Sequence, residues 1–429
     1  MNRFPLPFVL VALLSCYGPV AAQSFVANYD ETQVPAYELP DPLRTESGQP
    51  VDSPQQWEAQ RRGEILDLFR SQVFGRSPDP ISVEHRIVGT DRQALGGKAI
   101  RRDFDVTLRR GDRSLTFAML VYSPQTDEPV PAFLGLNFQG NHTIEADPAI
   151  RITSSWVRAR NDGSTAGNQA LAAGRGIRSA AWPVEMIIDR GYGLATIYYG
   201  DIDPDFDDGF ENGIHPLFAD WAESVEPGQR WGSIAGWAYG LSRALDVLDS
   251  DPRIDGSRVA VIGHSRLGKT SLWAGASDER FKLVISNNSG CGGAALSRRA
   301  FGETVGRINT AFPHWFCRNH HRYNENESEL PVDHHQLLAL IAPRAVYVAS
   351  ASEDLWADPR GEFLACVHAD PVYRLLGTDG LGGEAAPEKM PAADQPLLEG
   401  SIGYHLRSGG HALTEYDWSQ YLTFADRHL

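Results

Sequence analysis

The architecture of this protein can be predicted outward from one segment, Val261-Ile-Gly263-His-Ser265-Arg-Leu-Gly268-Lys269-Thr270. An apolar run at 258–262 leads into it, and Ser-Leu-Trp-Ala-Gly-Ala at 271–276 continues with residues that suit a helix. This order predicts a buried strand, a tight turn that carries glycine, and a helix. Two different kinds of functional site use such a turn, so the segment alone leaves its chemistry open.

The segment matches two motifs. Read from Gly263 to Thr270 it is G-x-x-x-x-G-K-T, the phosphate-binding P-loop, whose backbone N–H groups and lysine hold a nucleotide. Read as Gly263-His-Ser265-Arg it is the nucleophile elbow of an α/β-hydrolase, with the closing glycine one residue later than in G-x-S-x-G. Both interpretations place the motif between a strand and a helix, so the rest of the chain must distinguish them.

The hydrolase interpretation requires an acid and then a histidine downstream of the serine. The apolar run 345–349 leads into Glu353 and Asp354, and His411 follows a short strand-like segment just before the last helical stretch. We therefore expect Ser265 to be the nucleophile, His411 its general base, and a carboxylate to orient the imidazole. A nucleotide-binding protein would also need an acidic strand end for Mg²⁺, for which we find no convincing candidate; it remains the alternative from another class.

Two neighbouring features have competing interpretations. Arg266 follows the nucleophile, where the backbone N–H of an oxyanion hole lies, and its guanidinium either adds charge to that hole or faces solvent. His334 and His335 are adjacent, and adjacent residues on a helix point in different directions. We therefore expect helix packing or capping there, and no metal site.

The apolar runs elsewhere indicate the fold class. Segments with strand alternation at 100–108 and 115–122 are followed by continuous apolar runs at 132–138, 193–199, 258–262, 282–285 and 345–349. Continuous runs of this length are typical of strands covered on both faces. Helices are expected around 57–69 and over 234–248, where apolar residues share one face. The pattern predicts an α/β-hydrolase with a central, mostly parallel sheet and helices on both faces.

The first 22 residues have the pattern of a secretory signal peptide, with Arg3, an apolar run at 8–14, and small residues before a cut at Gln23. A lipoprotein anchor at Cys16 is the competing possibility. We expect a secreted or periplasmic protein with a single catalytic domain at 23–429 and insertions at about 140–189 and 377–396. The three remaining cysteines form either one disulfide of undetermined pairing or buried thiols: Cys291, Cys317 and Cys366.

Charge and hydropathy exclude other classes of partner. The 429 residues include 39 Lys and Arg against 55 Asp and Glu, a formal net charge of −16. Nucleic-acid binding needs clustered cations, so we expect no nucleic-acid partner. The run at 8–14 is shorter than the roughly 20 apolar residues of a membrane span, and no later run approaches that length. We expect no membrane partner and a monomeric protein.

Several segments together resemble the bacterial branch of carbohydrate esterase family 15, the glucuronoyl esterases: Gly263-His-Ser-Arg-Leu-Gly-Lys269, Asn288-Ser-Gly-Cys-Gly-Gly-Ala294, Asp333-His-His335, Asp354-Leu-Trp-Ala-Asp-Pro359 and Gly410-His411. The resemblance covers most of the chain from about residue 30 onward. It implies an α/β-hydrolase without metal or cofactor that cleaves the ester between the 4-O-methyl-glucuronic acid branch of glucuronoxylan and lignin alcohols. It also implies Arg266 at the oxyanion hole, Lys269 and Trp356 against the uronate ring, and Glu303 near its hydroxyl groups.

One position departs from the pattern of that family. Many members carry the acid of the triad as a glutamate where this chain has Asn288, and an amide cannot stabilise an imidazolium by charge. We expect the acid from the end of the next strand, with Asp354 favoured over Glu353 and Asp333 as a third candidate. An esterase of the same fold acting on acetyl xylan or another small ester remains the alternative, and so does an inactive polysaccharide-binding relative.

Overall fold

The computed structural model describes residue 1, residues 25–387 and residues 389–429. Apart from Met1, the expected signal peptide and the alternative anchor at Cys16 lie outside the described residues. Within the described ranges, no helix combines the length and the apolar composition needed to cross a bilayer.

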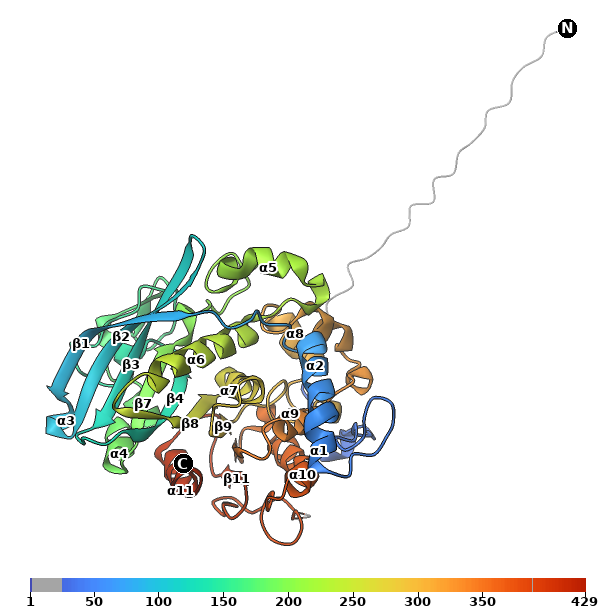
Figure 1. Ribbon diagram of the computed structural model, residues 1–429. Helices are drawn as coiled ribbons and strands as arrows, with labels where there is room; N and C mark the ends of the chain where they lie inside the picture. The colour runs from blue at the N-terminus through green and yellow to red at the C-terminus, as the bar shows by residue number, and fades with distance from the viewer. Residues whose placement is uncertain (2–24, 388) are drawn as a thin grey trace.

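A nine-stranded sheet forms the centre of the molecule (Figure 1), in the order β1-β2-β3-β7-β4-β8-β9-β10-β11. Strands β1, β2, β3 and β7 pair antiparallel, whereas every pairing from β7 to β11 is parallel. The mostly parallel sheet predicted from the apolar runs is therefore confirmed. The strands are β1 Val83–Gln93, β2 Ala99–Arg110, β3 Arg113–Pro124, β4 Val130–Asn137, β7 Gly193–Tyr198, β8 Ile254–His264, β9 Leu283–Asn287, β10 Ala345–Ala351 and β11 Ile402–Arg407.

Each predicted run lies within one of these strands, apart from at most one residue at an end, but β1 was not predicted. This strand is at the edge of the sheet, and most of its side chains are exposed. Without a buried face, selection for alternating apolar residues is weak, so β1 carries little periodic signal.

Successive side chains of the central strands enter two different cores. On β8, Val259 and Val261 belong to one core, and Ala260 and Ile262 belong to the other. Figure 1 shows α6 and α7 on one side of β8 and α11 on the other. Helices α2 Arg62–Gln72, α6 Ser233–Asp249, α7 Arg266–Ser277, α9 His334–Ala339 and α10 Pro359–Leu375 pack into the first core, and α4 Val184–Asp189 and α11 Glu415–His428 into the second. Helices therefore cover both faces, as expected.

The remaining helices are short: α1 Pro54–Gln56, α3 Ala94–Gly97, α5 Ala219–Ser224 and α8 Val305–Ala311. Residues 140–189 hold only short elements, among them α4 and the two-residue strands β5 Thr165–Ala166 and β6 Gln169–Ala170. The single catalytic domain with insertions at 140–189 and 377–396 stays a prediction. Of the two possibilities for the cysteines, the structure has buried free thiols at Cys291, Cys317 and Cys366.

Candidate active site

Ser265 occupies the turn between β8 and α7. Its backbone has φ 59° and ψ −128°, a combination that residues with a side chain rarely adopt. The turn is possible because residue 263 is glycine: a Cβ there would lie 1.8 Å from the carbonyl oxygen of Leu267. The N–H of Ser265 donates to the carbonyl oxygen of Asn287 at 2.8 Å, which ties the turn to the end of β9. A strained strand-to-helix turn of this kind is the geometry of a nucleophile elbow.

His411 and Asp354 form a pair on the neighbouring loops. Nδ1 of His411 lies 2.6 Å from Oδ2 of Asp354, and the amide of Asn288 donates to the same oxygen at 2.8 Å. Burial raises the pKa of Asp354, but the hydrogen bond and charge of His411 outweigh burial and lower it below its ordinary value. Because an ionised carboxylate can only accept, Nδ1 of His411 donates a proton to this hydrogen bond, and in the neutral imidazole Nε2 is then the acceptor.

The other two acid candidates lie elsewhere. Glu353 is exposed, and its backbone N–H donates to the carbonyl oxygen of Gly409 at 2.9 Å. Asp333 is buried at the N-cap of α9, where it accepts from the N–H of Ser297 at 2.8 Å and pairs with Arg298 at 3.4 Å. Of the three carboxylates, Asp354 is the one that contacts His411.

The two adjacent histidines are buried on α9, which starts at His334. Nε2 of His335 lies 2.9 Å from the carbonyl oxygen of Pro40, so this side chain ties α9 to the N-terminal segment. In the part of the chain that the structure describes, no group of three His, Cys, Asp or Glu side chains is arranged to hold a metal ion.

One cavity of about 400 Å³ joins the elbow to the histidine and its acid. Apart from the two other acid candidates, Glu353 and Asp333, every site residue selected from the sequence lines this cavity: Ser265, Arg266, Lys269, Glu303, Asp354, Trp356 and His411. These residues come from the ends of β8 and β10, from α7, and from loops that are far apart in the sequence. The fold therefore gathers them at the carboxyl edge of the parallel strands, where open α/β sheets bind ligands.

Arg266 is held beside the elbow by residues that the sequence did not single out. Its guanidinium forms an ion pair with Asp205 and lies 4.7 Å from the ring centre of Trp315. Asp205 is buried, and burial raises its pKa, but hydrogen bonds from His314 and Trp315 and the charge of Arg266 outweigh burial and lower it. Asp205 lies among several aspartates at 201–208, so nothing in the local sequence distinguishes it.

Lys269 and Glu303 form a second charged pair in the cavity. Nζ of Lys269 donates to the carbonyl oxygen of Ser289 and lies 3.7 Å from Oε2 of Glu303. Burial raises the pKa of Glu303, whose backbone N–H donates to the carbonyl oxygen of Trp356 at 3.0 Å. A P-loop lysine must instead be free to reach phosphates, and a neighbouring carboxylate would repel them. The phosphate-binding interpretation of this motif therefore fails.

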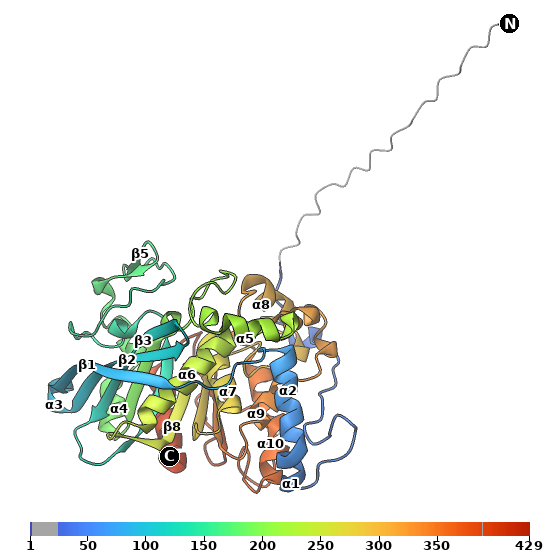
Figure 2. The same cartoon turned by 45° about the horizontal axis from the view of Figure 1, so that its top comes forward.

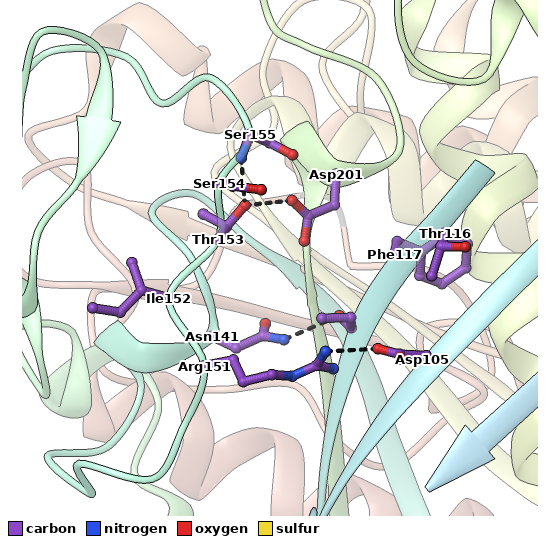
Figure 3. Close-up of a pocket in the computed structure, with 11 residues that line it drawn as sticks. Asp105, Thr116, Phe117, Asn141, Arg151, Ile152, Thr153, Ser154, Ser155 and Asp201 are labelled. Atoms are coloured by element: carbon purple, nitrogen blue, oxygen red, sulfur yellow. Dashed lines mark hydrogen bonds and ion pairs between the residues drawn. The ribbon is translucent and has the colours of Figure 1, made fainter. Parts of the chain in front are cut away.

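A separate polar pocket of about 200 Å³ shares no residue with this cavity (Figure 3). Its polar groups bond to one another: Arg151 pairs with Asp105 at 2.6 Å, and the hydroxyl of Thr153 donates to Asp201 at 2.5 Å. These bonds tie the segment around residues 151–155 to β2 and to the turn that follows β7. None of the site residues selected from the sequence lines it, so the cavity at Ser265 is the candidate active site.

Comparisons of sequence connect this site with known esterases. A family model described as "Glucuronyl esterase, fungi" matches residues 225–377. The chain is 49% identical over 436 aligned residues to carbohydrate esterase MZ0003 from an unknown prokaryotic organism, with 100% of this chain and 99% of the relative covered. It is 26% identical over 377 residues to the 4-O-methyl-glucuronoyl methylesterase of Schizophyllum commune, with 83% and 80% covered.

Comparisons of structure agree. A promiscuous esterase of carbohydrate esterase family 15 from a marine bacterial metagenome superposes with a TM-score of 0.87 at 50% identity, over 94% of this chain and 100% of that one. A glucuronoyl esterase from Solibacter usitatus superposes with a TM-score of 0.84 at 44% identity, over 92% and 99%. The similarity extends over nearly the whole chain. The chain therefore belongs to carbohydrate esterase family 15, and it is a carboxylic ester hydrolase with the α/β-hydrolase fold.

Proposed function

We propose that the protein hydrolyses the ester between the (4-O-methyl-)glucuronic acid of glucuronoxylan and lignin alcohols. The observation that carries this proposal is one cavity that is lined by Ser265 and the His411–Asp354 pair together with the Lys269–Glu303 pair and Trp356. The names of similar proteins support it: the Solibacter relative is a glucuronoyl esterase, and the Schizophyllum relative is a 4-O-methyl-glucuronoyl methylesterase.

The proposed reaction begins with acylation of the serine. His411 Nε2 accepts the proton of Ser265 Oγ as that oxygen bonds to the C6 carbonyl carbon of the uronate. Asp354 keeps the other proton on Nδ1 and stabilises the imidazolium that forms. The bond from C6 to the alcohol oxygen then breaks, and the alcohol leaves with the proton from His411. Water, deprotonated by His411, then attacks C6; as the bond from C6 to Oγ breaks, His411 returns the proton to Oγ, which releases the uronate and restores Ser265.

Arg266 is proposed to stabilise the negative oxygen that develops on the carbonyl. It is the first residue of α7, and an N–H at that position has no partner within its helix. Its guanidinium is held in place by Asp205 and Trp315, so little reorganisation is needed as charge develops. An N–H and a fixed cation together form the oxyanion hole of this proposal.

Lys269, Glu303 and Trp356 are proposed to select the sugar acid. The ammonium group can donate to ring or hydroxyl oxygens, and the carboxyl group of Glu303 can bind hydroxyl groups. The indole of Trp356 offers a flat apolar surface to the C–H face of the ring. No metal or cofactor takes part in these steps. We further propose that residues 1–22 direct export and that the mature chain is a monomer with one catalytic domain.

Hydrolysis of benzyl glucuronate tests the proposal, with benzyl galacturonate and acetylated xylan as comparison substrates. We expect the glucuronate ester to be preferred and the Ser265→Ala variant to lose activity by several orders of magnitude. Hydrolysis of acetyl esters without hydrolysis of uronate esters would favour the acetyl xylan esterase alternative. No hydrolysis of any ester by the purified protein would favour an inactive polysaccharide-binding relative.

A further inference from the structure

The N-terminal arm, residues 25–34, is attached to the loop that carries Glu303. The described part of the fold starts beside α8 (Figures 1 and 2). The carbonyl oxygen of Asn28 accepts from the N–H of Gly302 at 2.8 Å. Glu31 pairs with Arg299 at 2.7 Å and with Arg360 at 3.1 Å. The arm is therefore fixed next to the proposed uronate-binding residues.

The loop of Glu303 and the loop of Trp356 are in direct backbone contact beneath this arm. Gly302 has φ 64°, and a Cβ on it would lie 2.5 Å from the carbonyl oxygens of Leu355 and Trp356. Phe25 extends the surface that these loops form: its ring centre lies 6.0 Å from that of Trp356, with the rings nearly perpendicular. Since 42% of Phe25 is exposed, an aromatic surface continues from the cavity to the outside of the protein.

Arg307 adds a positive charge at the same place. It projects from α8, lines the cavity, and its guanidinium carbon lies 5.8 Å from the ring centre of Phe25. The other two cations of the cavity are paired, Arg266 with Asp205 and Lys269 with Glu303. Within the described ranges of the chain, no carboxylate lies within 4.0 Å of the guanidinium of Arg307, so its N–H donors remain available to a ligand.

We propose that Phe25 and Arg307 form an outer sugar subsite that binds a further sugar residue of the polysaccharide attached to the uronate. A sugar ring has an apolar C–H face, which an aromatic ring covers, and hydroxyl oxygens, which a guanidinium can bind with its five N–H groups. The subsite adjoins Trp356 and Glu303, whereas the alcohol leaves beside His411. This inference rests on the proposed function, because its occupant is attached to the sugar acid assigned to the inner cavity.

The test varies the two ends of the substrate separately. The substrates are the benzyl and methyl esters of 4-O-methyl-glucuronic acid, each free or linked to xylotriose. The variants are Phe25→Ala and Arg307→Ala; the controls are Val26→Ala, at a side chain that is 83% exposed beside Phe25, and Arg322→Ala, at an exposed arginine outside the cavity. We expect both variants to lower kcat/KM about fivefold on the xylotriose-linked esters, mainly through KM, and to leave the free esters within about twofold.

Three results would overturn the subsite. Equal losses on free and linked esters would mean that the arm only supports Trp356. If the loss of kcat/KM is larger on the benzyl esters than on the methyl esters, the surface of Phe25 and Arg307 binds the aryl group of the alcohol. Unchanged kinetics on every substrate would leave Phe25 and Arg307 without a role in binding. Wild-type activity on the free esters tests the proposed function independently, since a protein inactive on all four esters would fail that proposal first.

Discussion

Two neighbouring loops on the carboxyl edge of the sheet differ in the side chain that each carries near His411. The loop after β9 carries Asn288, and the loop after β10 carries Asp354. Because β9 and β10 are parallel neighbours, their ends meet, and the amide of Asn288 donates to Asp354 at 2.8 Å. The family resemblance places an acid on the first loop, whereas the acid that contacts the histidine here lies on the second. In this chain the carboxylate that reaches Nδ1 of His411 comes from the end of β10.

The two loops are also supported differently. The β9 loop rests on the buried Glu362, whose Oε1 accepts from the N–H groups of Ser289 at 2.8 Å and Gly290 at 2.9 Å. The hydroxyl of Ser350 donates to its other oxygen at 2.6 Å. Burial raises the pKa of Glu362 to about 8. The backbone of the β9 loop is thus supported from beneath by a carboxyl group of α10, whereas the β10 loop presents its own carboxylate to the histidine.

The largest effect is expected from Asp354→Asn. An amide cannot hold the proton on Nδ1 of His411 or stabilise the imidazolium, so kcat on benzyl glucuronate should fall about 10⁴-fold. Glu353→Gln is the matched control one residue earlier, and its kcat should stay within about twofold, because Glu353 is exposed. Near-normal kcat of Asp354→Asn together with a loss of kcat in Glu353→Gln would contradict the assignment of Asp354 as the partner of His411. Small, equal losses of kcat in both variants would point to Asp333 as the acid.

Moving the acid between the loops should recover part of that loss. We expect Asn288→Glu combined with Asp354→Asn to be about 100-fold more active than Asp354→Asn alone, because a carboxylate would return within reach of His411. The same kcat assay measures the recovery, and Asn288→Gln with Asp354→Asn controls for side-chain length. If the glutamate and glutamine double variants are equally inactive, the two loops are not interchangeable in this chain.

The Glu362→Gln variant should lose the part of the pH dependence of the free energy of unfolding that arises from titration of Glu362 beneath the β9 loop. Since the pKa of Glu362 is about 8 in the folded protein and ordinarily 4.5, the folded state binds more protons between these values, and stability falls as pH rises through this range. The wild-type free energy of unfolding should drop relative to the variant by at most about 1.4 kcal/mol between pH 6 and 7. Urea unfolding at both pH values measures it. If the difference in the free energy of unfolding between wild type and variant is the same at pH 6 and pH 7, Glu362 titrates outside this pH range.

The smallest effect is expected from Asn288→Ala. The variant loses one hydrogen bond to Asp354, and kcat should fall about fivefold. This hydrogen bond helps to lower the pKa of Asp354, so its loss should raise that pKa, which an NMR titration of the carboxyl group measures. A pKa of Asp354 that stays at its wild-type value while kcat falls would assign Asn288 to support of the loop alone.

Much of the fold was predictable because the central strands are buried on both faces. Val259 to Ile262 enter two cores in turn, so each position must be apolar and the run is visible in the sequence. The exposed edge strand β1 lacks this constraint and was missed. The elbow was visible for a different reason, since the turn at Ser265 requires Gly263 and leaves a short-range motif.

The sequence by itself determined the fold class, the elbow, and the order of serine, acid and histidine, because these depend on local periodicity, turn chemistry and chain order. Only the tertiary structure decided which carboxylate meets His411. Asp354 and Glu353 are adjacent in sequence, but one is buried against the histidine and the other is exposed. The same holds for Asp205 beside Arg266 and for Phe25 beside Trp356. Such contacts join residues separated by tens to hundreds of positions, and no local pattern encodes a distance in space between segments that only the folded chain brings together.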